Sequence, residues 1–252
     1  LFVSGVDGEW NTIVDTDDRE VLLPGQEAAY SAFVQLKHEF TIPVILNVGG
    51  RFDYKVRRAA DPVNDIAGQD DIPDFSPRLA LIVRPAEVFS TKFSYAESFV
   101  DAPYWYRYNN LASYAGAVTL TPEQLRAAQI TPELTLLDGR FKSTSNFAYQ
   151  SVDNFIYRDN DAAPGDPFYI NAGQLNSLIF EEELAFIEAV FRARANATYQ
   201  HVLDVQNYEA PDGGNRINHV PSVVGNLVLD ANPLVTFDQE SCLLYKAALN
   251  AD

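Results

Sequence analysis

The sequence predicts an all-β chain that folds as an antiparallel transmembrane β-barrel with about eleven strands. Two observations lead to this prediction. Long segments alternate apolar and polar side chains with a period of two residues, which gives a strand one apolar and one polar face. Short turns and long loops also alternate along the chain, which is typical of barrels with short turns at one rim and long loops at the other.

Residues 43–57 show the clearest alternation. The apolar face carries Val44, Leu46, Val48, Gly50, Phe52, Tyr54 and Val56. The polar face carries Ile45, Asn47, Gly49, Arg51, Asp53, Lys55 and Arg57. A usual strand has about 5–6 residues, so a strand of this length suits a barrel wall better than a small sandwich.

The same pattern predicts the remaining strands. In chain order, the eleven segments are 1–14, 28–40, 43–57, 75–84, 89–96, 122–137, 140–158, 169–186, 190–201, 220–231 and 236–249. Besides 43–57, four of them alternate cleanly. Their apolar faces carry Tyr30, Ala32, Val34 and Leu36; Phe75, Leu79, Leu81 and Val83; Phe89, Phe93 and Tyr95; and Phe191, Ala193, Ala195, Ala197 and Tyr199.

The predicted connections fall into two sets. Short turns are expected at 41–43, 85–87, 138–139, 187–189 and 232–235, of which Asp138–Gly139 is a strong hairpin signal. Long loops are expected at 15–26, 58–73, 98–121, 159–168 and 203–219, and they hold much of the acidic charge. Alternating strands also occur in soluble β-sandwiches and lipocalin-like barrels, but strand length and loop alternation favour the membrane barrel.

Composition excludes several classes of function. The net charge of −17 argues against a nucleic-acid-binding protein and against an anchor for anionic lipids, since both need basic surfaces. Cys242 is the only cysteine, so neither an internal disulfide nor a cysteine-based metal site is expected. The three histidines have no metal-ligand spacing, and no catalytic triad or phosphate-binding loop stands out. We therefore expect no enzyme activity, no metal and no cofactor.

Six ordered motifs resemble TonB-dependent outer-membrane receptors. In chain order, they are Tyr30 to Gln35 followed by LNVGGRFDY at 46–54, FSPRLALIVRP at 75–85, FSYAESFVDAP at 93–103, LTPE at 120–123, NAG at 171–173 and VP at 220–221. The motifs resemble the later, C-terminal part of the family's barrel. About eleven strands would be half of a 22-stranded transporter barrel.

The resemblance implies a function. Receptors of this family bind a scarce nutrient outside the cell and import it with energy from the inner membrane, and their ligands include siderophores, haem, cobalamin and glycans. It implies residence in the bacterial outer membrane. Residues 1–252 would be one partial barrel domain, and the plug domain is not expected in this sequence. The expected partners are the TonB protein through a missing N-terminal segment, the remaining strands and plug, outer-membrane lipid and a possible surface lipoprotein.

Two sets of side chains are candidates for ligand contact. The first is the aromatic cluster Tyr104, Trp105, Tyr106, Arg107 and Tyr108, which can clamp an anionic or ring-bearing ligand but is favoured as an interfacial aromatic girdle. The second is a set of basic residues expected to face the lumen: Arg51, Lys55, Arg78, Lys92, Arg192 and Arg194. They can contact a plug or guide an anionic substrate, while a polar lumen wall is the favoured interpretation. Asp159, Asp161 and Asp166 could hold Ca²⁺, although a solvated loop fits them better.

One strand departs from the family pattern. In LIFEEEL at 178–184, Ile179 stands where a small residue is usual, and Glu182 shares the face of Phe180 and Leu184, which is expected to meet lipid. Three explanations stay open: the strand bulges, Glu182 lies near a rim, or this face does not meet lipid. Two other functions also stay open, namely a soluble β-rich module that binds a ligand or carbohydrate, and a purely structural barrel or adhesin.

Overall fold

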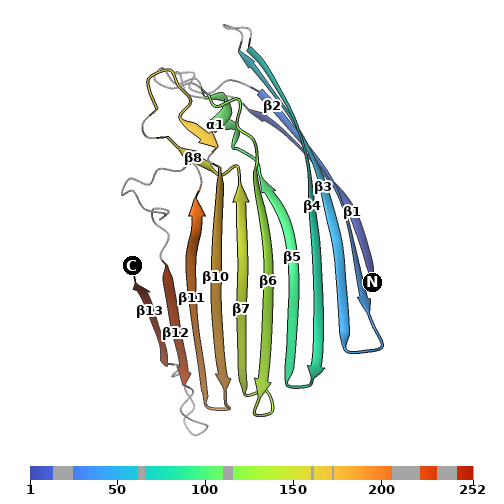
Figure 1. Cartoon of the computed structure of the whole chain (residues 1–252), viewed down its shortest axis with the longest axis vertical. Coiled ribbons are helices and arrows are strands. Elements are labelled where there is room, and N and C mark those ends of the chain that lie inside the picture. Colours follow the sequence, from blue (N-terminus) through green and yellow to red (C-terminus); the bar gives the residue numbers. More distant parts are fainter. Residues whose placement is uncertain are drawn as a thin grey trace.

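The computed structural model describes residues 1–13, 25–61, 66–109, 116–159, 162–171, 173–205, 222–231 and 243–251. Eleven of its strands form one antiparallel sheet in the order β1-β2-β3-β4-β5-β6-β7-β10-β11-β12-β13. Strand order follows chain order, and only β8 and β9 leave the wall to pair with each other (Figure 1). The predicted all-β wall of eleven strands is confirmed.

The wall strands have the following bounds. They are β1 (Phe2–Ile13), β2 (Gly25–Glu39), β3 (Val44–Asp61), β4 (Ile66–Ala86), β5 (Phe89–Val100), β6 (Glu123–Leu136), β7 (Phe141–Asp153), β10 (Gln174–Ile187), β11 (Phe191–Val205), β12 (Val223–Ala231) and β13 (Leu243–Ala251). The other elements are the helix α1 (Tyr104–Tyr108) and the short strands β8 (Ile156–Arg158) and β9 (Tyr169–Asn171). No helix among the described residues is long and apolar enough to cross a membrane.

The register keeps polar side chains on one face across neighbouring strands. Asp7 pairs with Ser31, which pairs in turn with Asp53. Further along the wall, Asn146 pairs with Glu181, which pairs with Thr198. Because pairing residues point to the same side of a sheet, these polar side chains gather on one face of the wall.

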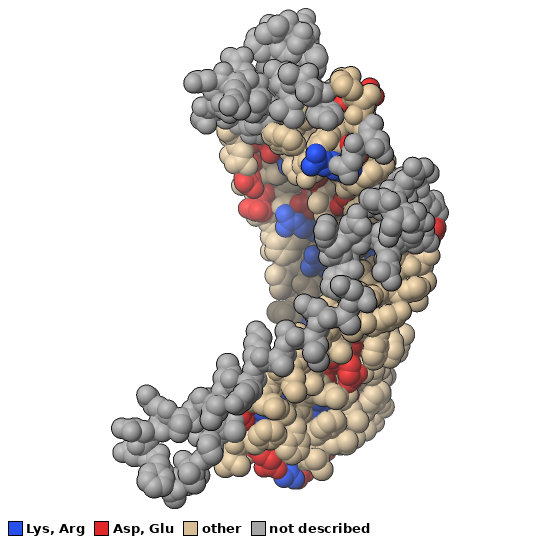
Figure 2. Space-filling model, turned by 90° about the vertical axis from the view of Figure 1, so that its left-hand side faces the viewer, with Lys and Arg blue, Asp and Glu red and all other residues tan. Residues whose placement is uncertain are grey.

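The sheet is curved into a trough, and Figure 2 shows charged side chains in the upper part of its hollow. The convex face carries large apolar side chains that remain exposed, among them Val6, Trp10, Phe75 and Phe147. Val6 is 85% exposed and Trp10 is 61% exposed, which would be unfavourable in water. This inside-out arrangement, polar within and apolar without, is that of a barrel wall in lipid.

Among the described residues, short turns join β2 to β3, β4 to β5, β6 to β7 and β10 to β11 at the lower rim in Figure 1, and α1, β8 and β9 lie at the upper rim. The turn between β6 and β7 fits its sequence, because Leu137, Asp138 and Gly139 all have positive φ values of 55°, 55° and 87°. Glycine adopts such a conformation without steric cost. The short turn expected at 232–235 lies outside the described residues.

Three predicted segments differ from the structure. The segment 58–73 is not a long loop, because β3 and β4 continue to pair as far as Asp61 and Ile66. Acidic residues there indicated a loop, but a strand above the membrane needs no apolar face. The segments 140–158 and 169–186 are each divided, into β7 with β8 and into β9 with β10. At the first division, Asn154 has a φ of 57°, which ends the extended conformation.

The pairing of β4 with β5 ends at Arg78 and Ala96, although both strands continue upward. Directly above Arg78 in β4 stands Pro77, which has no N–H to donate. The upper part of β4 is therefore paired with β3 alone, as far as the described residues go. Proline is tolerated there because this part of β4 is an edge.

Candidate functional site

Helix α1 lies at the upper rim, just after β5 (Figure 1). It is held by the segment that leads into β6. The Ala117 N–H donates to the Tyr106 carbonyl at 2.9 Å, and the Arg107 guanidinium donates to the Leu120 carbonyl. Gly116 allows this approach, because a Cβ there would lie 2.2 Å from the Arg107 carbonyl oxygen.

The five residues of α1 are the aromatic cluster that the sequence analysis singled out. Tyr104, Arg107 and Tyr108 are buried, and the rings of Tyr104 and Tyr108 lie 4.7 Å apart. Trp105 and Tyr106 are half-buried, so these two keep surface that a ligand can reach. Ligand contact by this cluster stays a prediction.

Residues around β8 and β9 extend the aromatic cluster. Tyr106 stacks on Tyr169 with centroids 3.6 Å apart and an interplanar angle of 10°. Trp105 meets the same ring edge-on at 5.9 Å. The guanidinium carbon of Arg158 lies 4.1 Å from the centre of Phe168, which itself packs against Tyr169. Burial, with a smaller effect of Tyr106, raises the pKa of Tyr169.

The sequence pattern did not predict Arg158, Phe168 and Tyr169 as members of this cluster. A signal was present, because Phe168 and Tyr169 lie just before the Asn171-Ala-Gly173 motif. Their side chains meet α1 only because β8 and β9 fold back as a separate two-stranded sheet.

Below α1, four charged side chains form an ion cluster on the inner face. Arg57 contacts both Glu27 and Asp101, with 2.6 Å between its Nη2 and Asp101 Oδ2. Lys55 Nζ lies 3.2 Å from Asp101 Oδ2 and 3.5 Å from Glu27 Oε1. The Arg57 side chain is only 1% exposed, so these charges compensate one another largely out of water.

Tyr104 lies over this ion cluster. Burial, and next the negative charge of Glu27, raise the pKa of Tyr104 to about 12. The hydroxyl lies close to Gly25 at the start of β2, where a Cβ would be 2.0 Å from the oxygen. The ion cluster and Tyr104 together connect α1 to β2 and β3.

A second set of contacts joins two motifs of the sequence. Asn171 Nδ2 donates to the Thr121 carbonyl at 3.0 Å and to the Asn154 carbonyl at 2.6 Å. The Thr121 N–H donates back to Asn171 Oδ1 at 2.8 Å. Glu123 Oε1 accepts from the Ile156 N–H at 2.6 Å, so it positions the start of β8. These bonds fix the two-stranded sheet beside α1.

The other predicted basic residues lie on the inner face but in different surroundings. Arg51 is paired with Asp53 at 2.9 Å and donates to Ser31. Arg51 and Arg78 line one cavity of about 630 Å³ at β2–β5. The register places Lys92 on the inner face of β5, and Arg192 and Arg194 on that of β11, where Arg192 pairs with Asp230. The structure therefore brings only Arg51 with Arg78 into one cavity and Lys55 into the ion cluster, and their role toward a plug or substrate stays a prediction.

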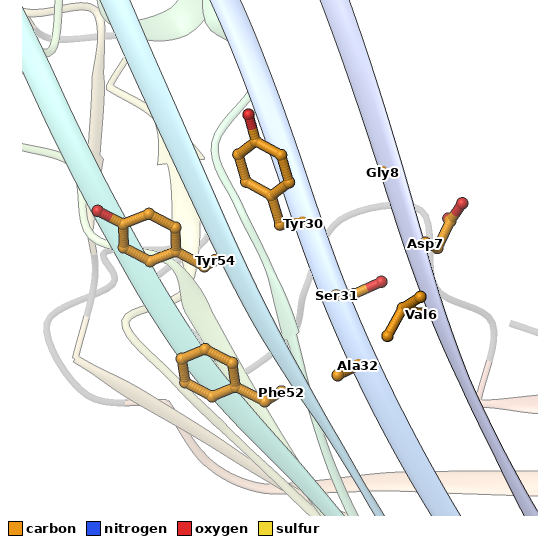
Figure 3. A pocket seen from close by; sticks show the side chains of 8 residues that line it. All are labelled: Val6, Asp7, Gly8, Tyr30, Ser31, Ala32, Phe52 and Tyr54. Carbon is orange, nitrogen blue, oxygen red and sulfur yellow. The ribbon is translucent and has the colours of Figure 1, made fainter.

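The outer face also has a hollow, of about 570 Å³, on β1–β3. Figure 3 shows Tyr30, Tyr54 and Phe52 around it, with the small residues Gly8 on β1 and Ala32 on β2. Tyr30 pairs with Tyr54 and Ala32 pairs with Phe52, so these side chains share the lipid-facing side. This hollow is thus separate from the inner face.

The acidic residues proposed for Ca²⁺ are only partly described. Asp161 lies outside the described residues, and the Asp159 N–H donates to the Phe168 carbonyl at 3.0 Å. Within the described ranges, no group of three His, Cys, Asp or Glu side chains is arranged to hold a metal ion.

The chain was compared with known proteins. The family model "TonB dependent receptor-like, beta-barrel" matches residues 6–242. No curated protein matches the sequence. Among solved structures, the haemophore receptor HasR of Serratia marcescens, solved with its haemophore HasA and haem, superposes with a TM-score of 0.70 at 17% identity, over 91% of this chain and 46% of HasR.

Two further structures are similar. The iron transporter FrpB of Neisseria meningitidis has a TM-score of 0.66 at 13% identity, over 92% of this chain and 38% of FrpB. The siderophore receptor PiuA of Acinetobacter baumannii has a TM-score of 0.64 at 17% identity, over 84% of this chain and 32% of PiuA. At these identities the likeness concerns the fold, and the chain spans less than half the length of each of these proteins.

Proposed function

The chain belongs to the TonB-dependent receptor β-barrel family, and on this basis we propose that it forms the later, C-terminal part of the barrel of a nutrient-uptake receptor. The family consists of transport receptors, and its barrels reside in the outer membrane of Gram-negative bacteria, where this chain is accordingly placed. Its work would be binding and energised passage of a nutrient, with no bond made or broken in the substrate.

One observation carries the proposal: the wall separates a polar, charged inner face from an apolar outer face. The inner face carries the ion cluster of Glu27, Lys55, Arg57 and Asp101, while large apolar side chains stay exposed outside. A soluble binding module would have to cover that outer face, whereas lipid covers it in a membrane barrel. A polar lumen below a rim with aromatic side chains suits passage of a polar ligand.

The ligand would first contact the upper rim of the barrel. Half-buried Trp105 and Tyr106 and the neighbouring Tyr169 offer ring surface there, and exposed Arg158 offers positive charge. Such a surface favours a ring-bearing or anionic ligand. Siderophores, haem, cobalamin and glycans all remain candidates. The three structures named above are an iron transporter, a siderophore receptor and a haemophore receptor solved with haem, so iron complexes are the first to test.

The proposed partners follow from the family. They are the TonB energy-transducing protein, a plug, the remaining barrel strands, outer-membrane lipid and a possible surface lipoprotein. In the described sheet, β1 and β13 are the two edges and do not pair with each other, so further strands between them would close the barrel. The inner basic residues would then face the plug.

The first test concerns the closed barrel. The native receptor that contains this chain should be taken from an outer-membrane fraction and run on a gel without boiling and after boiling. We expect a band much heavier than 28 kDa whose mobility changes on boiling, because closed barrels resist the detergent until heated. A 28 kDa species found only in the soluble fraction, with no change on boiling, would contradict the proposal.

The second test concerns transport. A strain that lacks the receptor gene should be compared with a complemented strain on media limited for one nutrient at a time: for iron, supplied as a ferric siderophore or as haem; for cobalamin; or for carbon, supplied as a glycan. Restored growth on one of these sources, lost when the TonB protein is inactivated, supports energised import. Growth that is equal with and without the receptor on all four sources would contradict it.

A further inference from the structure

Glu182 places a carboxylate on the lipid-facing side of the wall. It lies on β10 and pairs with Ser145 of β7 on one side and with Ala197 of β11 on the other. On the same face, Phe147 lies opposite Phe180, with ring centroids 4.9 Å apart. Glu182 therefore points away from the polar inner face, on the side of the wall that also carries Phe147 and Phe180.

Its height in the wall decides between the explanations that the sequence left open. The register shift between β10 and β11 falls at Asn176 and Ser177, and the pairing at Glu182 is regular on both sides, so no bulge turns the side chain away. Toward the lower rim, the pair of Phe186 and Phe141 lies four residues away, about 13 Å along the strand. Toward the upper rim, the pair of Leu178 and Tyr149 lies equally far. Glu182 is thus midway across the apolar band and not at a rim.

The carboxylate has two hydrogen-bond donors in the wall. Ser143 Oγ donates to Glu182 Oε1 at 2.7 Å, and Ser145 Oγ donates to Glu182 Oε2. Hydroxyl donors reduce the desolvation cost of the carboxylate. Its negative charge still lies at a depth where lipid offers no positive charge to offset it. Ionisable residues at such depth are usually paired with a group of opposite charge.

The side chains in the row of Glu182 are small, so the outer surface is recessed there. One row across four strands consists of Ser145, Glu182, Ala197 and Gly225, which pair in sequence from β7 to β12. The row above it consists of the larger residues Phe147, Phe180, Tyr199 and Val223. Small side chains let another backbone approach closely within a membrane. An incoming segment can therefore reach the carboxylate along Ala197 and Gly225.

We propose that Glu182, with Ser143 and Ser145, is an intramembrane docking site for a membrane-spanning protein segment that presents a Lys or Arg side chain. Charge complementarity selects a cationic partner. The depth of Glu182 disfavours a lipid ammonium group, which lies at the membrane surface. A second copy of the same face would bring two like charges together. The inference needs only a membrane-spanning wall and does not depend on nutrient import.

The experiment uses the full-length receptor in phosphatidylcholine vesicles. Two synthetic membrane-spanning peptides serve as probes: an all-leucine segment and the same segment with one central lysine. Association is measured by energy transfer from a donor dye on the receptor to an acceptor on the peptide. We expect the lysine peptide to bind at least tenfold more tightly than the all-leucine peptide, and Glu182→Gln to remove this difference.

Glu181→Gln is the matched control, because it removes the same charge from the adjacent residue on the inner face, where Glu181 accepts a hydrogen bond from Asn146. The control should keep the tenfold preference. Loss of the preference in both variants, or its absence in the unmodified receptor, would overturn the proposal. A heat-dependent gel shift shows for each variant that the barrel has folded.

A second variant tests the site with the carboxylate in place. Ala197→Leu raises the row beside Glu182 and should weaken binding of the lysine peptide several-fold, while Ala32→Leu, in the outer hollow on β2, should not. Equal binding to the Ala197 and Ala32 variants would contradict docking along this row. Native mass spectrometry covers the lipid alternative: phosphatidylethanolamine retained by the unmodified receptor and lost in Glu182→Gln would assign the site to a headgroup and overturn the proposal.

Discussion

Asn171 and Thr121, which are 50 positions apart in the chain, each donate a hydrogen bond to the other. The Thr121 N–H donates to Asn171 Oδ1 at 2.8 Å, and Asn171 Nδ2 donates to the Thr121 carbonyl at 3.0 Å. The pair joins the entry to β6 with the end of β9. Both bonds use the side-chain amide of Asn171 and the backbone of Thr121, which explains physically why an asparagine stands in the NAG motif at 171–173.

Replacing Asn171 tests this joint. Asn171→Ala removes the bonds to Thr121 and Asn154. The free energy needed to open this rim locally should therefore fall by about 1–3 kcal/mol. Hydrogen exchange of the full-length receptor should show faster exchange at the Thr121 N–H. Asn171→Asp, which keeps the acceptor but loses the donors, should protect Thr121 better than alanine does. Unchanged exchange in the alanine variant would show that the bonds do not hold the rim.

Arg57 is expected to be the most sensitive charge of the ion cluster. Arg57→Met leaves Glu27 and Asp101 without their main cation in a buried place, so the free energy of unfolding should fall by about 3–5 kcal/mol. The measurement is unfolding of the receptor in urea. Lys37→Met, which removes an exposed pair with Glu39, should cost less than about 1 kcal/mol. Adding Glu27→Gln and Asp101→Asn should recover part of the loss at Arg57.

The pKa of Tyr104 predicts a response to alkali. Since its pKa is raised from 10.0 to about 12, the folded state holds the phenol proton more tightly than the unfolded state. The resulting contribution to stability is fully present below pH 10 and is lost as the pH rises toward 12. Ultraviolet titration of the unmodified receptor and of Tyr104→Phe should differ by one tyrosine that ionises late. A difference that titrates near pH 10 would contradict the burial of this hydroxyl.

Gly116 tests how closely α1 is packed. Gly116→Ala would place a Cβ 2.2 Å from the Arg107 carbonyl oxygen, so the backbone must move, at a cost of about 1–3 kcal/mol. Proteolysis of the rim should become faster. Gly225→Ala is the control, because its nearest atom would be at an ordinary 3.6 Å. Equal effects of the two substitutions would argue against close packing at α1.

Trp105 is the residue of α1 on which ligand binding is expected to depend most. It is half-buried and leaves ring surface open, so Trp105→Ala should weaken binding of the imported nutrient about tenfold, or about 1.4 kcal/mol. Binding to cells is measured with the nutrient that restores growth. Tyr108→Phe, a change at a buried ring, should leave it unaltered. Normal binding by the Trp105 variant would assign the cluster to packing alone.

The sequence predicted the wall well because lipid outside the barrel and the polar lumen inside it make apolar and polar side chains alternate along each strand. Val48, Phe52 and Tyr54 lie on the apolar face and Arg51 on the polar face, as expected. The predictions failed where the wall leaves lipid. Above the membrane, acidic residues such as Asp70 and Asp71 continue in β4, since no apolar face is needed there.

The rim was predicted less completely. The sequence pointed to Tyr104–Tyr108 but not to a helix, because five residues are too short to show a helical period. It also gave no means of placing Tyr169 against Tyr106, a contact made by a strand that leaves the wall. The ion cluster combines Glu27 of β2, Arg57 of β3 and Asp101 just after β5, and period-two patterns carry no information on residues so far apart in the sequence.

The order of the strands in the wall has a consequence for how the wall assembles. Except where β8 and β9 intervene, each wall strand pairs with the strand that precedes it in the chain. A growing wall can therefore satisfy the backbone groups of each new strand at once, hairpin after hairpin, with little search among distant partners. The slow step in assembly is then expected at β7 and β10, which must wait for the small sheet between them to fold aside.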